Sequence, residues 1–134
     1  NWMTVICCAP YATMEAALKV ARKYDGDVQV ELYGDWTFEQ AQKWREIGLT
    51  QVIYHRGRDA AFAGQQWGEE DLTKIRKLTD MGFAVSVTGG LYAKDLDIFK
   101  GIAVKCFIAG RGLYAAEDPA QAAREFKEAI RKHW

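Results

Sequence analysis

The sequence predicts an α/β fold in which five consecutive strand-then-helix units form a parallel sheet. Two observations lead to this prediction. Short β-branched or apolar runs recur five times, and each ends in a polar or glycine-rich tip that leads into an amphipathic helix. No Ser/Pro-rich linker, low-complexity tract or block of like charge interrupts the series, so we expect one domain over residues 1–134. Such sheets carry their chemistry at the carboxyl ends of the strands.

The five expected strands are continuous apolar runs or alternations of apolar and polar residues. They are expected at residues 2–9, 28–32, 51–54, 83–87 and 104–108. In the second strand, alternation places Gln29 and Glu31 opposite the apolar residues. In a barrel the apolar set faces the helices, so we expect Gln29 and Glu31 to point into the lumen.

Apolar residues at helical spacing and capping residues place a helix after each strand. Helices are expected near 13–24, from Thr37 to Gly48, near 93–99, and after Asp118. The helix of the third unit is expected to carry Leu72, Ile75 and Leu78 and to end at Gly82. Thr37 and Gln40 have the spacing of a capping box. In the last helix we expect Asp118 as the cap, Pro119 at the first position and Gln121 completing the box.

Composition and charge exclude several classes of function. Eighteen basic residues balance eighteen acidic ones, so no net field draws the chain to nucleic acid or to an anionic membrane. No apolar stretch approaches the roughly 18 residues of a membrane span, and the signal-peptide order is absent, so we expect a cytoplasmic protein. Cys7, Cys8 and Cys106 fall within expected strands without metal-ligand spacing, and we interpret them as buried apolar residues.

Two architectures accommodate five such units: an open doubly wound sheet and part of a barrel. An open nucleotide-binding sheet usually has its glycine turn after the first strand, whereas a barrel often binds phosphate after its last two strands. The first tip, at residues 8–11, lacks glycine, while the last two contain Gly89, Gly90 and Gly110. This favours the barrel. Because a closed barrel needs about 200 residues or more and the chain begins at Asn1 directly before a strand, we expect further chain upstream.

Candidate catalytic residues gather at the third tip. His55 is followed by Arg56, Arg58 and Asp59, and charges crowded at a sheet edge are costly unless they are solvated, paired or turned toward an anionic ligand. A structural His55 and a surface ion pair for Arg56 are the alternatives. A lumen-facing Glu31 needs a partner, and its alternative is a structural ion pair with a Lys or Arg.

The tips of the last two strands predict a phosphate site, and His133 is not part of that site. Gly89, Gly90 and Gly110 let backbone N–H groups converge on an anion, and Arg111 adds a two-pronged cationic donor. Tight turns also need glycine, so the adjacent pair of tips is more informative than either one alone. His133 lies in the expected terminal helix, where we expect it to be solvated.

Four segments together resemble the 3-keto-L-gulonate 6-phosphate decarboxylase family, within the orotidine 5'-phosphate decarboxylase suprafamily. The segments are YHRGRDA at 54–60, VTGG at 87–90, FIAGR at 107–111 and WTFEQAQKWR at 36–45. The likeness extends over the whole chain. It implies a homodimer of (β/α)8 barrels in which Mg²⁺ and a lysine stabilise the enediolate formed as CO₂ leaves, with L-xylulose 5-phosphate as the product.

The resemblance also implies roles for individual residues. His55 and Arg58 would deliver the proton through water, with Glu31 holding that network. Thr88 would shape the pocket for the sugar-phosphate substrate. Phosphate would be bound by Gly89, Gly90, Gly110 and Arg111.

The family's Asp-x-Lys-x-x-Asp motif and its acidic metal ligand, which belong to the second and third strands, are absent from this chain. We therefore expect the chain to be the carboxyl-terminal part of the barrel, strands four to eight, with two unpaired sheet edges and no activity alone. The metal ligands are expected upstream.

Three other functions compete with this interpretation. A hexulose-6-phosphate synthase would condense formaldehyde with ribulose 5-phosphate, but that sister family usually lacks the second arginine of the third tip and has alanine where Thr88 stands. A noncatalytic phosphate-binding half-barrel is a second alternative. A receiver-like signalling domain is a third, but the first tip lacks the acidic cluster that such a domain needs.

Overall fold

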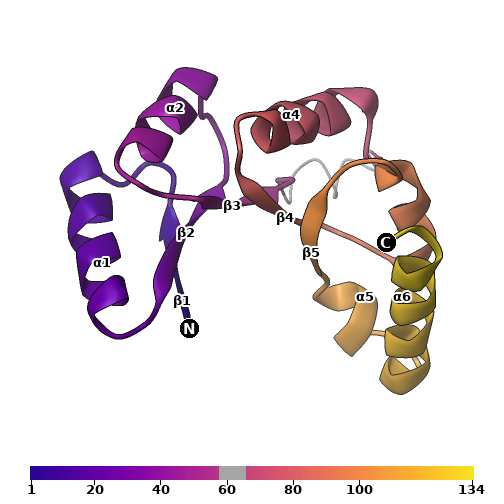
Figure 1. Cartoon of the computed structure of the whole chain (residues 1–134). Coiled ribbons are helices and arrows are strands. Elements are labelled where there is room, and N and C mark those ends of the chain that lie inside the picture. The colour runs from indigo at the N-terminus through magenta and orange to yellow at the C-terminus, as the bar shows by residue number, and fades with distance from the viewer. Residues whose placement is uncertain (58–65) are drawn as a thin grey trace.

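The computed structural model describes residues 1–57 and 66–134, so the candidate Arg58 lies outside the described residues. Five strands form one parallel sheet, arranged in the order β1-β2-β3-β4-β5 (Figure 1). The strands are β1 (Trp2–Ile6), β2 (Asp27–Leu32), β3 (Gln51–His55), β4 (Ala84–Thr88) and β5 (Val104–Ile108). A doubly wound sheet reverses its strand order at a switch point, whereas a barrel adds each strand beside the last. The consecutive order is therefore that of a barrel.

The helices lie on the outer side of the curved sheet (Figure 1). They are α1 (Tyr11–Lys23), α2 (Phe38–Glu46), α4 (Glu69–Asp80), the 3-10 helix η1 (Ala93–Phe99), α5 (Arg111–Tyr114) and α6 (Pro119–His133). The short helix α5 was not expected from the sequence. None of the helices in the described ranges is long and apolar enough to cross a membrane.

Helix capping follows the sequence in three of its four expected features, one of which is Pro119 at the first position of α6. Thr37 and Gln40 form the reciprocal capping box, with Oγ1 of Thr37 accepting from the Gln40 N–H at 3.2 Å. Asp118 caps α6 by accepting from the Gln121 N–H at 2.9 Å. The expectation that Gln121 completes that box is wrong, because its side chain bonds to Glu125 and Arg124 within the helix.

Strand alternation separates an outer, helix-facing side of the sheet from an inner side. On β2 the exposure pattern alternates strictly, and Gln29 and Glu31 lie opposite the buried residues as expected. Parallel register aligns Glu31 with Ile53, Ser86 and Cys106 across neighbouring strands. His55 and Thr88 are aligned in the same way at the carboxyl ends. The inner side therefore carries the candidate catalytic residues Glu31 and His55 and the candidate substrate-binding residue Thr88.

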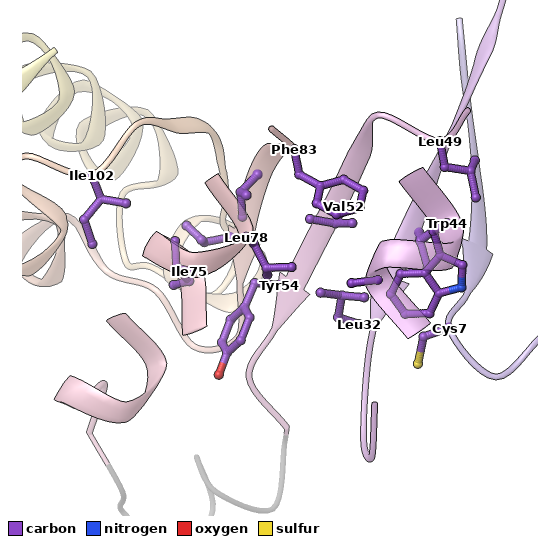
Figure 2. Packing of buried hydrophobic residues seen from close by; sticks show 14 of the residues in the cluster. Cys7, Leu32, Trp44, Leu49, Val52, Tyr54, Ile75, Leu78, Phe83 and Ile102 are labelled. Carbon is purple, nitrogen blue, oxygen red and sulfur yellow. The ribbon is translucent and has the colours of Figure 1, made fainter. Parts of the chain in front are cut away.

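The core lies between the outer side of the sheet and the helices (Figure 2). Trp44 of α2 and Ile75 and Leu78 of α4 are almost fully buried. They belong to one apolar cluster with Leu32 and Val52 of the sheet. Burial of these apolar side chains stabilises the packing of the helices on the sheet by roughly 25 cal/mol per Å² of apolar surface removed from water. The core thereby gives the inner rim a rigid support.

Two expectations about cysteines are wrong. Strand β1 ends at Ile6, and the chain turns there, with the Ala9 N–H donating to the Ile6 carbonyl at 3.0 Å. Cys7 and Cys8 therefore follow the strand, and only Cys7 is buried. Cys106 lies in β5 as expected but is exposed. Strand β5 is the last strand of the sheet and pairs only with β4 among the described residues, so its other edge is unpaired there.

His133 is also placed differently from the expectation of a solvated residue. Its side chain is 7% exposed, and its Nε2 lies 2.6 Å from Oδ1 of Asp97 in η1. The neighbouring Trp134 indole donates to the Ile102 carbonyl at 3.2 Å, and its ring packs against Phe107. These contacts join the end of α6 to η1 and β5. Burial of His133 results from this packing, which the helical pattern of α6 does not reveal.

We predict that Asp97 makes folding stability sensitive to acid. Hydrogen bonds from His133 and then Lys132 lower the pKa of the Asp97 carboxyl below its ordinary value of 3.8. A carboxylate with a depressed folded-state pKa contributes stability that is present above pH 3.8 and is lost as the pH falls through the folded-state pKa. Thermal unfolding followed from pH 6 to pH 3 should therefore show a shallower acid-side decline in Asp97→Asn than in the unsubstituted chain. Parallel curves would contradict this prediction.

Candidate active site

A pocket of about 230 Å³ opens at the carboxyl ends of β3, β4 and β5. Three consecutive strand tips contribute to its wall. The lining residues are His55, Arg56, Thr88, Gly89, Gly90, Leu91, Gly110, Arg111, Gly112 and Tyr114. Every described residue that the sequence analysis assigned to substrate binding is in this set. His55 is there too, so the tip of β3 meets the two glycine-rich tips.

The tip of β4 requires glycine. Gly89 and Gly90 have φ values of +114° and +67°, in the range that disfavours side chains. A Cβ on Gly89 would overlap the carbonyl oxygen of Arg56 and lie 2.8 Å from the Arg56 Cβ. Gly89 therefore allows the β4 tip to pack directly on the backbone that follows β3.

The tip of β5 contains a glycine that the sequence analysis missed. Gly110 precedes α5, and Arg111 begins that helix with an exposed side chain. A Cβ on the next residue, Gly112, would overlap the carbonyl oxygen of Leu91. The sequence Gly-Arg-Gly does not by itself reveal this contact, because Leu91 belongs to the tip that follows β4. Together Gly89 and Gly112 let the three tips approach one another closely around one pocket.

Glu31 and His55 form a pair on the inner side of the sheet. Oε1 of Glu31 lies 2.6 Å from Nδ1 of His55, and both side chains are partly exposed. A carboxylate only accepts, so Nδ1 of His55 is the donor in this hydrogen bond. The ring of Tyr33 meets the imidazole edge at 5.1 Å between centroids. The partner of Glu31 is thus the imidazole rather than the Lys or Arg of the structural alternative.

Thr88 and Arg56 have defined contacts at the same rim. The Thr88 hydroxyl donates to the Ile108 carbonyl at 2.9 Å, so it joins the ends of β4 and β5. Arg56 is 9% exposed, and its guanidinium lies over the Trp67 ring at 4.9 Å. Arg56 is therefore buried, rather than at the surface as that alternative expected. Burial follows from strand parity, because residue 56 continues the outer side occupied by Val52 and Tyr54.

The described residues offer no metal centre. Within residues 1–57 and 66–134, no group of three or more His, Cys, Asp or Glu side chains is placed to hold a metal ion. The Glu31 and His55 pair alone is not a ligand set for Mg²⁺, which prefers several oxygen ligands.

The geometry combines two chemical capacities at one rim. Glycine backbone and Arg111 suit a phosphate group, and the Glu31 and His55 pair supplies an oriented proton donor or acceptor next to it. His55, Gly90 and Arg111 lie around one pocket rather than at opposite ends of the molecule. The site therefore suits acid–base chemistry on a phosphorylated small molecule.

Comparison with known proteins gives consistent matches. The sequence model of the orotidine 5'-phosphate decarboxylase / HUMPS family matches residues 1–126. The 3-keto-L-gulonate-6-phosphate decarboxylase UlaD of Salmonella paratyphi B is 57% identical over all 134 residues, which span 62% of that protein. The chain thus covers less than two thirds of this relative's length.

Solved structures agree in fold. The structure of KGPDC from Streptococcus mutans in complex with a sugar phosphate superposes with a TM-score of 0.96 at 53% identity, over all of this chain and 63% of that one. The 3-keto-L-gulonate-6-phosphate decarboxylase of Vibrio cholerae superposes with a TM-score of 0.91 at 45% identity, over 62% of its chain. The predicted fold class, a partial (β/α)8 barrel, is confirmed.

Proposed function

Since the chain belongs to the orotidine 5'-phosphate decarboxylase / HUMPS family, we propose that it is part of a decarboxylase acting on 3-keto-L-gulonate 6-phosphate. The reaction releases CO₂ and yields L-xylulose 5-phosphate, a step in L-ascorbate breakdown. The single observation that carries the proposal is the joining of the Glu31 and His55 pair to the glycine and Arg111 pocket at one rim. Identity of 57% to the Salmonella enzyme supports this substrate.

Phosphate binding and proton delivery are assigned to different residues. Gly89, Gly90, Gly110 and Arg111 bind the phosphate and fix the distance from it to the reacting carbons. When CO₂ leaves, its bonding electrons remain on the substrate as an enediolate, and one proton must reach the carbon. His55, oriented by Glu31, delivers that proton through water.

Other parts of the proposal rest on the family resemblance. Arg58 shares the proton delivery, and Thr88 shapes the pocket. Mg²⁺ is the proposed cofactor and would stabilise negative charge on the substrate oxygens, with ligands from outside the described residues. A cytoplasmic homodimer is the proposed working form.

We predict that the 134-residue chain has no decarboxylase activity alone. The lysine and acidic metal ligands of the family are not matched by a motif in this sequence, and β1 and β5 each pair with a single strand among the described residues. CO₂ release measured with 3-keto-L-gulonate 6-phosphate and Mg²⁺ should equal the protein-free rate. A complete chain that includes this segment is the positive control. Turnover by the isolated chain would refute the prediction.

Parallel measurements of both reactions and of sugar-phosphate binding in a complete chain distinguish the alternative functions. A complete chain that condenses formaldehyde with ribulose 5-phosphate faster than it releases CO₂ would be a synthase. A complete chain that binds sugar phosphate but turns over neither substrate would be a noncatalytic binding module. The proposed decarboxylase requires CO₂ release to dominate.

A further inference from the structure

We propose that Trp67 is a positioning residue for the phosphate pocket and that it acts through Arg56. Trp67 holds the Arg56 side chain, and the Arg56 backbone in turn supports Gly89. The inference rests on the proposed phosphate-binding role of the β4 and β5 tips. It adds a residue to that site that lies outside the pocket wall.

The contact between Trp67 and Arg56 joins two separate segments. Arg56 follows β3, and Trp67 lies just before α4. The guanidinium carbon is 4.9 Å from the indole centroid, and both residues are buried. A desolvated cation over an indole face is the strongest form of this interaction. The planar Arg side chain suits this stack better than the ammonium of Lys.

Trp67 is itself held from several sides. Its ring packs against Phe99 at 5.1 Å and against Tyr54 at 6.2 Å between centroids. Asp71 fixes the backbone beside it, since one carboxylate oxygen accepts from the Gly68 N–H at 3.1 Å. The other oxygen accepts from the Tyr54 hydroxyl at 2.7 Å. Burial and the Asp71 contact raise the pKa of Tyr54, so the hydroxyl remains a donor. These contacts hold the Trp67 ring in one position beneath the Arg56 guanidinium.

Arg56 transmits this fixed position to the glycine tip. Its N–H donates to the Thr88 carbonyl at 3.0 Å, which continues the pairing of β3 with β4. Its backbone and Cβ occupy the space directly beside Gly89. A shift of Arg56 therefore displaces Gly89 and the adjacent N–H groups, which must converge on a phosphate to bind it. Small displacements of positioned groups weaken such sites strongly.

The chain contains a matched control for a test. Phe83 is buried at the amino end of β4 and also lies under a guanidinium, that of Arg45, at 5.4 Å. Trp67→Leu and Phe83→Leu each remove an aromatic ring from beneath an arginine. Both substitutions destabilise the core, but only the first is linked to the pocket. Trp67→Phe keeps an aromatic face under Arg56 and is the conservative variant.

The experiment measures binding of inorganic phosphate and of D-ribose 5-phosphate to a complete chain that carries this segment by calorimetry, with thermal unfolding measured in parallel. Trp67→Leu should weaken binding about tenfold, Trp67→Phe by less than about threefold, and Phe83→Leu should leave it unchanged. Equal affinities of Trp67→Leu and Phe83→Leu would overturn the inference and leave the phosphate site intact. If Trp67→Leu does not fold, unchanged affinity in Arg56→Lys overturns it. Absence of binding by the unsubstituted chain would overturn the proposed site as well.

Discussion

Gly89→Ala is expected to lower strongly both the free energy of unfolding and the affinity of the pocket for phosphate. The new Cβ meets the Arg56 carbonyl oxygen, and residue 89 has a φ of +114° that side chains rarely adopt. Backbone strain costs about 1–3 kcal/mol, and overpacking costs typically about 1–3 kcal/mol. From these two ranges we expect the free energy of unfolding to fall by about 3 kcal/mol and phosphate affinity to fall about tenfold or more. Denaturant unfolding and phosphate titration measure the two effects.

Gly101→Ala isolates the conformational part of this effect. Gly101 also has a positive φ, +80°, but a Cβ there meets nothing within 4 Å. The Gly101→Ala substitution should lower the free energy of unfolding by about 1 kcal/mol. It should leave phosphate binding unchanged, because Gly101 precedes β5 and so lies at the opposite end of that strand from the pocket. Similar losses of stability and affinity in both variants would show that close packing on Arg56 does not shape the pocket.

Substitution of His55 is expected to lower catalysis strongly in a complete chain that carries this segment. Acid–base groups contribute about 10²- to 10⁴-fold, so His55→Asn should lower kcat for CO₂ release by about that factor. KM should change little, because the glycine residues and Arg111 that we propose bind phosphate remain. Steady-state kinetics with 3-keto-L-gulonate 6-phosphate and Mg²⁺ separates the two parameters.

Glu31→Gln tests whether the carboxylate orients His55 or also supplies charge. The amide oxygen of Gln can still accept from Nδ1, which lies 2.6 Å from the carboxylate. A loss of about tenfold in kcat indicates that negative charge beside the imidazole matters. Glu46→Gln, on the exposed face of α2, is the matched control and should have no effect. Unchanged kcat in both His55→Asn and Glu31→Gln would remove the pair from the mechanism.

Much of the fold was predictable because strand and helix patterns are local. The alternation at residues 28–32 placed Glu31 on the inner side, and the Thr37 and Gln40 spacing located the start of α2. The glycine tips at 89–90 and 110 were recognised as one pocket because parallel strands end at the same edge of a sheet. These predictions depend on the chain's own periodicity and on a general rule of topology.

Other features had no local signal. His133 was expected in solvent, and its burial depends on Asp97 of η1, a residue distant in the sequence. The predictions that Cys8 and Cys106 are buried were wrong because residue type indicates only average burial. Cys8 lies in the turn after β1, and Cys106 lies on β5, which pairs only with β4 among the described residues. Gly112 was missed because its need for glycine comes from Leu91 on another tip.

By itself the sequence determined the five units, their parallel arrangement and the rim on which the chemistry lies, because hydrophobic period and turn chemistry act between near neighbours. Only the tertiary structure decided that Glu31 bonds Nδ1 of His55, that Arg56 is buried on Trp67, and that Gly89 and Gly112 are forced to be glycine. Those features depend on distances of a few ångströms between segments far apart in the chain, and such distances exist only after the helices have packed on the sheet.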